Sequence, residues 1–196
     1  MEGKIMSEYH LELRRKLFHL TLGSAIAFAV YLLKPIYGNF VLIPLVSGIV
    51  VMFVIPRALP DLRVSNHLLY HFERQKDIEN FPYKGAIHYG AGVFFPILLL
   101  DVKTACAIIM VLSVGDAFST LIGKFHGKMR IHQFAHKSVE GTIAFVVSSF
   151  VAALIFVNLG TAVMFALIGA AVELLSPWDD NFTVPVALTT VAIVLP

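Results

Sequence analysis

An aspartate inside an apolar run is the first residue of this sequence with clear chemical potential. Asp116 lies in a stretch, roughly Thr104 to Gly123, that is long enough to cross a bilayer. A charged side chain in such a run costs free energy, and it usually marks a pathway or a binding site. Because proteins hold magnesium with one or two carboxylates and substrate phosphates, we interpret Asp116 as a ligand of a metal-bound polyphosphate.

Small residues along the same helix give a second interpretation. Gly115, Ser119 and Gly123 recur every four positions and therefore share one helix face. Asp116 and Thr120 fall on the neighbouring stripe. Faces of small residues let two membrane helices pack closely. The segment could therefore serve helix packing alone, with Asp116 reaching the membrane interface.

The apolar run ends in a basic, glycine-containing loop, from Lys124 to Lys137. Gly123 and Gly127 let the backbone approach an anion, and Lys128 adds charge. Ser138 is predicted to cap the next helix, whose N-terminus offers free N–H groups to phosphate. Basic loops also arise from membrane topology alone. The sequence contains neither a P-loop nor a dinucleotide-binding fingerprint, so a nucleotide site would be of another kind.

Further acids are predicted at the same membrane edge. Glu173 lies inside another apolar run, where an acid is costly. Glu140 falls in the first turn of a predicted helix, a favourable position for any acid. Asp179, Asp180 and Asn181 form a polar hairpin that is equally typical of a simple turn.

The elements that position these residues follow from composition. Of 196 residues, 58% are hydrophobic and 14% are charged, whereas soluble domains are about half apolar and a quarter charged. The net charge of +2 is too small to indicate a nucleic-acid partner. The single cysteine, Cys106, excludes an intramolecular disulfide. The N-terminus shows no pattern of a cleaved signal peptide, so we expect the first apolar run to be retained.

We predict an all-α polytopic integral membrane protein of about seven transmembrane helices. It forms a single transmembrane domain over residues 1–196 without internal repeats. The spans are expected at roughly residues 17–33, 39–55, 85–100, 104–123, 138–157, 159–175 and 182–195. The last run is short for a span. The polar stretch 57–84 is expected to hold a short surface helix capped by Ser65.

The predicted topology places the polar clusters on one side of the membrane. The N-terminus, the stretch 57–84, the basic loop and the hairpin 176–181 share a side. Of the 15 lysines and arginines, only Lys34 and Lys103 fall on the other side. The positive-inside rule makes the first side cytoplasmic. We therefore expect a multi-pass protein with its N-terminus and a single site at the cytoplasmic face.

Three separated segments resemble the family of CTP-dependent lipid-alcohol kinases, which includes dolichol kinase, phytol kinase and CTP-dependent diacylglycerol kinase. They read E-L-R-R-K-L-F-H-L-T-L-G, then G-D-A-F-S-T-L-I-G-K-F-H-G-K followed by H-K-S-V-E-G, then E-L-L-S-P-W-D-D-N-F-T-V-P. The resemblance covers most of the chain. It implies CTP as the phosphoryl donor, Mg²⁺ as the divalent ion and a long-chain lipid alcohol as the acceptor. The short chain favours a phytol-like isoprenoid alcohol over dolichol.

The resemblance also implies roles for individual residues. Catalytic and metal-binding roles are expected for Asp116, Glu140 and Asp180. Nucleotide and phosphate contacts are expected from Arg15, Lys16, Gly123, Lys124, Gly127, Lys128, Lys137, Ser138 and Asn181. Substrate contacts are expected from His19, Thr120 and Glu173, although His19 could equally be a hydrogen-bonded helix histidine. The remaining expected contacts are with membrane lipids, and no oligomeric state is predicted.

Two other functions stay open at this point. The central segment also resembles CTP:phosphatidate cytidylyltransferases, which would release pyrophosphate rather than CDP. A non-enzymatic transporter would use Asp116 as an ion or proton relay and would show solute flux without a nucleotide-dependent product. The gathering of acids and basic glycine loops on one predicted face favours an enzyme.

Overall fold

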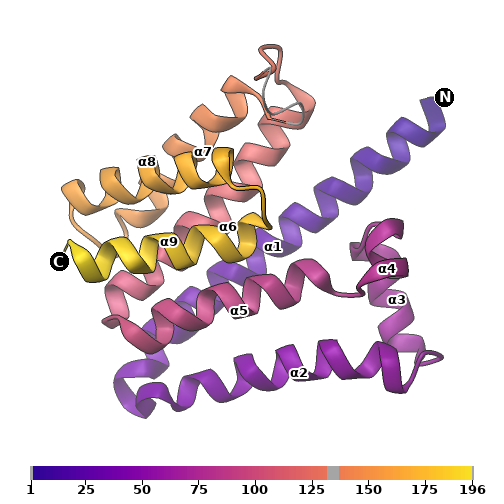
Figure 1. The fold of residues 1–196 in the computed structure, drawn as a ribbon, viewed down its shortest axis with the longest axis horizontal. Helices are drawn as coiled ribbons and strands as arrows, with labels where there is room; N and C mark the ends of the chain where they lie inside the picture. Colours follow the sequence, from indigo (N-terminus) through magenta and orange to yellow (C-terminus); the bar gives the residue numbers. More distant parts are fainter. Residues whose placement is uncertain (1, 132–136, 196) are drawn as a thin grey trace.

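The computed structural model describes residues 2–131 and 137–195, and these residues form an all-α protein (Figure 1). One isolated antiparallel bridge joins Arg130 to Ser138. The helices are α1 (Glu2–Tyr37), a 3-10 turn η1 (Gly38–Val41), α2 (Leu42–Ala58), α3 (Arg63–Phe72), α4 (Gln75–Asn80), α5 (Lys84–Leu99), α6 (Val102–Phe125), α7 (Val139–Ala153), α8 (Leu159–Leu175) and α9 (Asp180–Val194). The predicted all-α class is confirmed, and the number of membrane spans stays a prediction.

Side-chain caps explain where several helices begin. Ser138 accepts a hydrogen bond from the backbone N–H of Gly141 at 3.1 Å and starts α7, as predicted. Asp101, Asn158 and Asp179 precede α6, α8 and α9 and accept bonds from backbone N–H groups of the first turns. Each cap satisfies a donor that has no partner within its helix, so these polar residues fix the helix starts.

Two predicted boundaries were wrong in detail. α1 continues past Lys34 and Pro35, and it ends where Gly38 adopts a left-handed φ of 58°. Pro35 has no N–H and removes one helical hydrogen bond, and the helix ends two residues later at Tyr37. Ser65 does not cap α3, which begins two residues earlier at Arg63. Instead Ser65 is buried, and its hydroxyl lies 3.1 Å from the hydroxyl of Tyr83.

Helix α6 lies at the centre of the bundle and contacts α1, α5, α7, α8 and α9. Residues 105–113 of α6 are all buried, and Phe145 of α7 and Phe165 of α8 are fully buried in the same core. α1 and α2 differ, because they expose large apolar side chains such as Leu32 and Val50. An apolar exterior of this kind marks an interaction surface, for which lipid is the natural partner in this chain.

Two helical stretches of the described residues are long and apolar enough to cross a membrane. They are Tyr9–Ala58 and Val102–Phe125, judged by length and composition. α7, α8 and α9 are also apolar but shorter. The structure therefore agrees with helices of membrane-spanning character.

Close packing of α6 against α7 fixes the direction of Asp116. A Cβ atom added to Gly141 would lie 2.9 Å from the Cα of Gly123, and one added to Gly115 would lie 2.9 Å from the ring of Phe145. The small-residue face predicted from the sequence thus packs against α7. Asp116, on the neighbouring stripe, is turned toward α1 instead, so the packing interpretation and the functional one apply to different faces.

Candidate functional site

A cavity of about 1090 Å³ opens where the polar part of α1 meets the end of α6 and the starts of α7 and α9. Its walls carry both cations and carboxylates from segments far apart in the sequence. The lining residues are Leu11, Glu12, Arg15, Lys16, Arg74, Gln75, Lys76, Asp77, Lys84, Gly85, Ser119, Thr120, Gly123, Lys124, Arg130, Lys137, Ser138, Gly141, Thr142, Glu173, Asp179, Asp180 and Asn181.

Asp116 joins α6 to α1 beside this cavity. Its carboxylate is 1% exposed, and Lys16 donates to Oδ2 at 2.5 Å. His19 Nε2 lies 3.6 Å from the same oxygen, and Thr120 donates to Oδ1 at 3.4 Å. A buried carboxylate is tolerated when cations and donors surround it. Two residues from the N-terminal motif therefore contact the aspartate of the central motif.

Lys137 forms a second junction, between the basic loop and two C-terminal helices. It pairs with Glu173 of α8, and its Nζ lies 3.5 Å from Asp180 Oδ2 at the start of α9. Ser119 donates to Glu173 at 3.2 Å. Burial lowers the pKa of Lys137, but the carboxylates of Glu173 and Asp180 outweigh this effect and raise the pKa. Lys137 is thus held in its charged form.

The site offers oxygen donors that suit magnesium. Among the described residues, Glu173 Oε2 and Asn181 Oδ1 are buried without a hydrogen-bond partner. Carboxylate and amide oxygens are the ligands that hard divalent cations prefer. No group of three metal-ligating side chains is preformed in residues 2–131 and 137–195. The donor set therefore fits an ion that completes its coordination with substrate phosphates and water.

Glu140 lies at the same end of the bundle but has different partners. Its carboxylate accepts hydrogen bonds from the backbone N–H groups of Lys128 at 2.9 Å and Met129 at 3.1 Å. This arrangement holds the start of the basic loop against α7. A metal-binding role for Glu140 stays a prediction, and its observed contacts are with the loop rather than with Asp116.

The glycines at the start of the basic loop serve close packing. A Cβ atom on Gly127 would overlap the carbonyl oxygen of Gly123 and the hydroxyl of Ser138. Gly123 and Ser138 line the cavity, whereas Gly127 and Lys128 do not. Phosphate contacts of the last two residues stay predictions. Residues 132–136 of the predicted loop lie outside the described residues.

The remaining predicted residues are distributed around the same cavity. Arg15, Lys124, Thr120 and Asn181 line it. His19 does not line it, but its ring packs edge-on against Tyr89 at 4.8 Å between centroids, next to Asp116. The structure thus brings together three segments that are distant in the sequence: Lys16 and Asp116 are 100 residues apart, and Lys137 and Glu173 are 36 residues apart. The roles assigned to these residues stay predictions.

Several lining residues had no predicted role. Arg74, Lys76 and Lys84 come from the polar stretch between α2 and α5 and add positive charge to the cavity. Glu12, known only as part of the N-terminal motif, is 3% exposed and contacts several cations. The sequence placed the stretch 57–84 on the correct side of the bundle, but it contained no signal that the stretch folds back onto α1.

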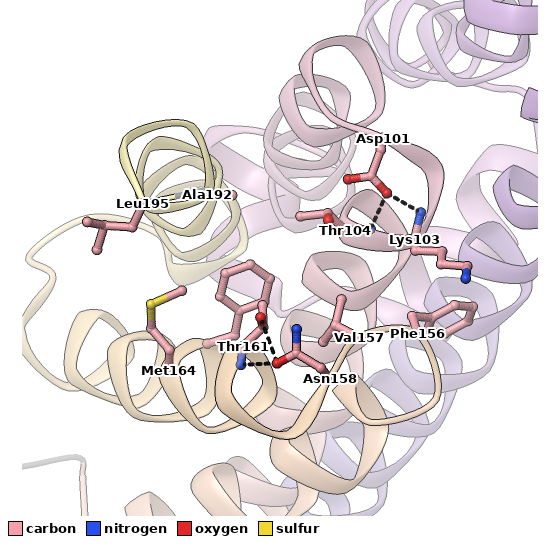
Figure 2. A pocket seen from close by; sticks show the side chains of 11 residues that line it. Asp101, Lys103, Thr104, Phe156, Val157, Asn158, Thr161, Met164, Ala192 and Leu195 are labelled. Atoms are coloured by element: carbon pink, nitrogen blue, oxygen red, sulfur yellow. Dashed lines mark hydrogen bonds between the residues drawn. The ribbon is translucent and has the colours of Figure 1, made fainter.

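A smaller cavity of about 430 Å³ lies at the opposite end of α6, α8 and α9 (Figure 2). Asp101 there accepts hydrogen bonds from the backbone of Lys103 and Thr104, and Asn158 accepts from Thr161. These polar groups are satisfied as caps of their own helices. The smaller cavity therefore lacks the convergent charges of the larger one.

Comparison with known proteins agrees with the geometry. An uncharacterised protein of Methanocaldococcus jannaschii is 33% identical over 89% of this chain and 88% of its own length. A phytol kinase of Synechocystis is 28% identical over 92% of this chain and 78% of its own. CTP-dependent diacylglycerol kinase 1 of Saccharomyces cerevisiae is 28% identical over 89% of this chain and 70% of its own.

The chain belongs to the family of CTP-dependent lipid kinases. The resemblance found in three short segments thus extends over about nine tenths of the chain. No family model matches the chain, and no solved structure matches it significantly.

Proposed function

We propose that this protein transfers the γ-phosphoryl group of magnesium-bound CTP to the hydroxyl of a long-chain isoprenoid alcohol. The observation that carries the proposal is the convergence of Lys16, Lys137 and Asp180 at one cavity, with Asp116 paired to Lys16 beside it. Phosphoryl transfer needs positioning and positive charge more than covalent chemistry, and the cavity offers both. The names of the phytol kinase and diacylglycerol kinase relatives support a lipid alcohol as acceptor.

The enzyme is proposed to be a multi-pass membrane protein of about seven spans with this cavity at the cytoplasmic face. Exposed apolar side chains on α1 and α2 support contact with lipid. α7, α8 and α9 have 15 to 17 residues, which corresponds to about 23–26 Å at the rise of an α-helix. A hydrocarbon core of about 30 Å would thin around them.

The proposed reaction uses the charges in a defined way. The bond between the γ-phosphorus and its bridging oxygen breaks, a bond to the lipid oxygen forms, and CDP leaves. Lys16 and Lys137 offset the charge of the phosphates, while a carboxylate of the cluster accepts the hydroxyl proton. Asp116 and Asp180 would hold magnesium, which when bound supplies neutralisation of phosphate charge.

The arrangement of α1 supports separate entry routes for the two substrates. Lys16 faces the cavity, and His19 lies three residues further toward the apolar part of the helix. Both contact Asp116. A nucleotide entering from the aqueous cavity and a lipid hydroxyl arriving from the membrane side, past His19 and Thr120, would therefore meet at the same carboxylate.

A labelling experiment tests the reaction class. Purified protein in lipid nanodiscs would be given CTP labelled at the γ- or the α-phosphate, together with phytol, geranylgeraniol, dolichol or diacylglycerol. We expect γ-label in a prenyl phosphate and CDP in the aqueous phase. Transfer of α-label with pyrophosphate release would instead show a cytidylyltransferase. Preferential labelling of diacylglycerol would overturn the proposed acceptor.

A further inference from the structure

Glu12 lies close to three cations at one edge of the larger cavity. They come from α1, from the link between α3 and α4, and from α6. Its Oε1 atom lies 3.0 Å from Arg15 Nη1, 2.7 Å from Arg74 Nε and 3.8 Å from Lys124 Nζ. The Oε2 atom is buried and has no hydrogen-bond partner in the described residues. Three cations around one carboxylate favour its charged form.

The cluster of Glu12, Arg15, Arg74 and Lys124 retains a surplus of positive charge. One carboxylate faces three cations, and all four side chains line the cavity. The side chains of Arg74 and Lys124 are 40% and 44% exposed, so both can reach a ligand in the cavity. Without Glu12, three like charges in this small volume would repel one another and separate.

The position of this cluster relative to Asp116 indicates its ligand. Glu12 and Lys16 are four residues apart in α1, so they lie on one face and about 6 Å apart along the axis. Lys16 contacts Asp116, the proposed reaction centre. A second cationic surface one helical turn away suits an extended polyanion whose one end reaches Asp116. Arginine in particular binds phosphate through several N–H donors.

Arg74 reaches the cavity only because the segment between α2 and α5 folds back onto α1. The Tyr83 hydroxyl bonds to Ser65 within this segment, and the rings of Phe72 and Phe18 pack at 4.8 Å between α3 and α1. The Glu12–Arg74 pair then ties the segment to the cavity wall. Arg74 therefore lines the cavity although it belongs to a part of the chain outside the three motifs.

We propose that Arg74 contacts the polyphosphate of the nucleotide and that Glu12 is a positioning residue that gathers Arg74, Arg15 and Lys124 for this purpose. The inference rests on the proposed function, because it assumes a nucleotide in the larger cavity. It adds a binding surface for the part of the phosphate chain that lies away from the reacting group.

Binding of inorganic tripolyphosphate tests this inference without requiring catalysis. Isothermal titration of the full chain in nanodiscs would compare the wild type with Arg74→Gln, Glu12→Gln and Glu12→Asp. Arg74→Gln should weaken binding about 10- to 100-fold, the range for a lost hydrogen bond to a charged group. Glu12→Gln should weaken it in the same direction, with Glu12→Asp between it and the wild type. Arg63→Gln, which removes a charge from the same segment outside the cavity, should bind like the wild type.

Kinetics separate a phosphate contact from a purely structural role. Arg74→Gln should raise KM for CTP by a similar factor, with kcat and KM for the lipid alcohol changed less than about threefold. The double variant Glu12→Gln/Arg74→Gln should lose less than the product of the single effects, because Glu12 acts through Arg74. If Glu12→Gln does not fold, Arg74→Gln decides alone, since its side chain is partly exposed.

Wild-type affinity for tripolyphosphate in Arg74→Gln, or a defect confined to kcat or to lipid KM, would overturn the inference. Failure of the proposed function would look different. In that case the wild type would form no CTP-dependent lipid phosphate, while Arg74→Gln would still lose tripolyphosphate binding.

Discussion

The two ends of the helical bundle use the same kinds of residue in different ways. At the end with the smaller cavity, Asp101 caps α6 (Figure 2). Lys34 donates there to the backbone carbonyls of Ile97 and Leu100 at the end of α5. At the other end, Asp116 and Lys137 contact side chains from other helices. Charges of the first group bond to backbone groups at helix ends, whereas those of the second group pair with charged side chains of other segments.

This difference shows that neither a cavity nor an acid beside it identifies a site. Both ends have a cavity, and both have aspartates that cap helices. The distinguishing property is that buried oxygens at the larger cavity, on Glu173 and Asn181, have no partner in the described residues. Unsatisfied buried oxygens are costly, and a bound cation would satisfy them.

The largest expected effect comes from removing one aspartate at each end. Asp116→Asn should lower kcat/KM for CTP by about 10³-fold or more, because it removes charge at the proposed metal site. Asp101→Asn makes the same chemical change at the other end and should keep activity within about threefold, since asparagine also caps helices. Radiometric assays of both purified variants measure this. Equal activities would remove the functional distinction between the two ends.

Removing one lysine at each end of the bundle should have a smaller effect on activity. Lys137→Gln leaves Glu173 and Asp180 without their shared cation and removes a charge from the phosphate site. We expect kcat to fall about 10²-fold. Lys103→Gln, at the edge of the smaller cavity, is the matched control and should have no effect on kcat. A normal rate for Lys137→Gln would show that this lysine serves packing only.

Glu173 links the site to stability. Glu173→Gln leaves Lys137 partly buried and without its closest carboxylate, so the free energy of unfolding should fall by about 3 kcal/mol. Chemical unfolding in detergent, followed by tryptophan fluorescence, measures this change. Asp101→Asn serves again as control and should lose less than about 1 kcal/mol. An unchanged free energy of unfolding for Glu173→Gln would mean that the Asp180 carboxylate alone is sufficient to stabilise the charge of Lys137.

The smallest expected effect concerns an acid at the charged end whose Oε2 atom has no hydrogen-bond partner in the described residues. Burial raises the pKa of Glu73 to about 6. The protonated carboxyl is favoured in the folded state, so its contribution to stability is present below the unfolded value of 4.5 and is lost as the pH rises through about 6. Glu73→Gln should therefore stabilise the protein by about 1–2 kcal/mol at pH 7.5 and not at pH 4.5.

Thermal unfolding at both pH values would measure this effect. Glu79→Gln, in the neighbouring α4, is the control, since Glu79 bonds only to Gln75 on the helix surface. A stabilisation by Glu73→Gln that is equal at pH 4.5 and 7.5 would contradict the titration of Glu73 as its cause.

Much of the fold was predictable, because helices in this chain follow long apolar runs with polar ends. The sequence indicated α8 to the residue and the Ser138 cap of α7. It misplaced the end of α1 and the cap of α3, where tertiary packing decided. α1 continues two residues past Pro35, and the Ser65 hydroxyl contacts the Tyr83 hydroxyl instead of capping α3.

The site was predictable only to the level of its segments. The three motifs converge on one cavity. Asp116 is important both in the sequence prediction and in the structure, where it pairs with Lys16. The sequence could not show that Lys16 and His19 share Asp116 or that Glu140 contacts the loop backbone. These pairings depend on helix rotation and approach, which a linear pattern does not fix. For the same reason Arg74 was missed.

A crystal structure of the protein with magnesium and a non-hydrolysable CTP analogue tests the central claim most directly. The account predicts phosphate density in the larger cavity, in contact with Lys137 and close to Asp116 and Asp180, with a cation between phosphate and carboxylate oxygens. Density in the smaller cavity beside Asp101 and Asn158, with the larger cavity free of nucleotide, would contradict it.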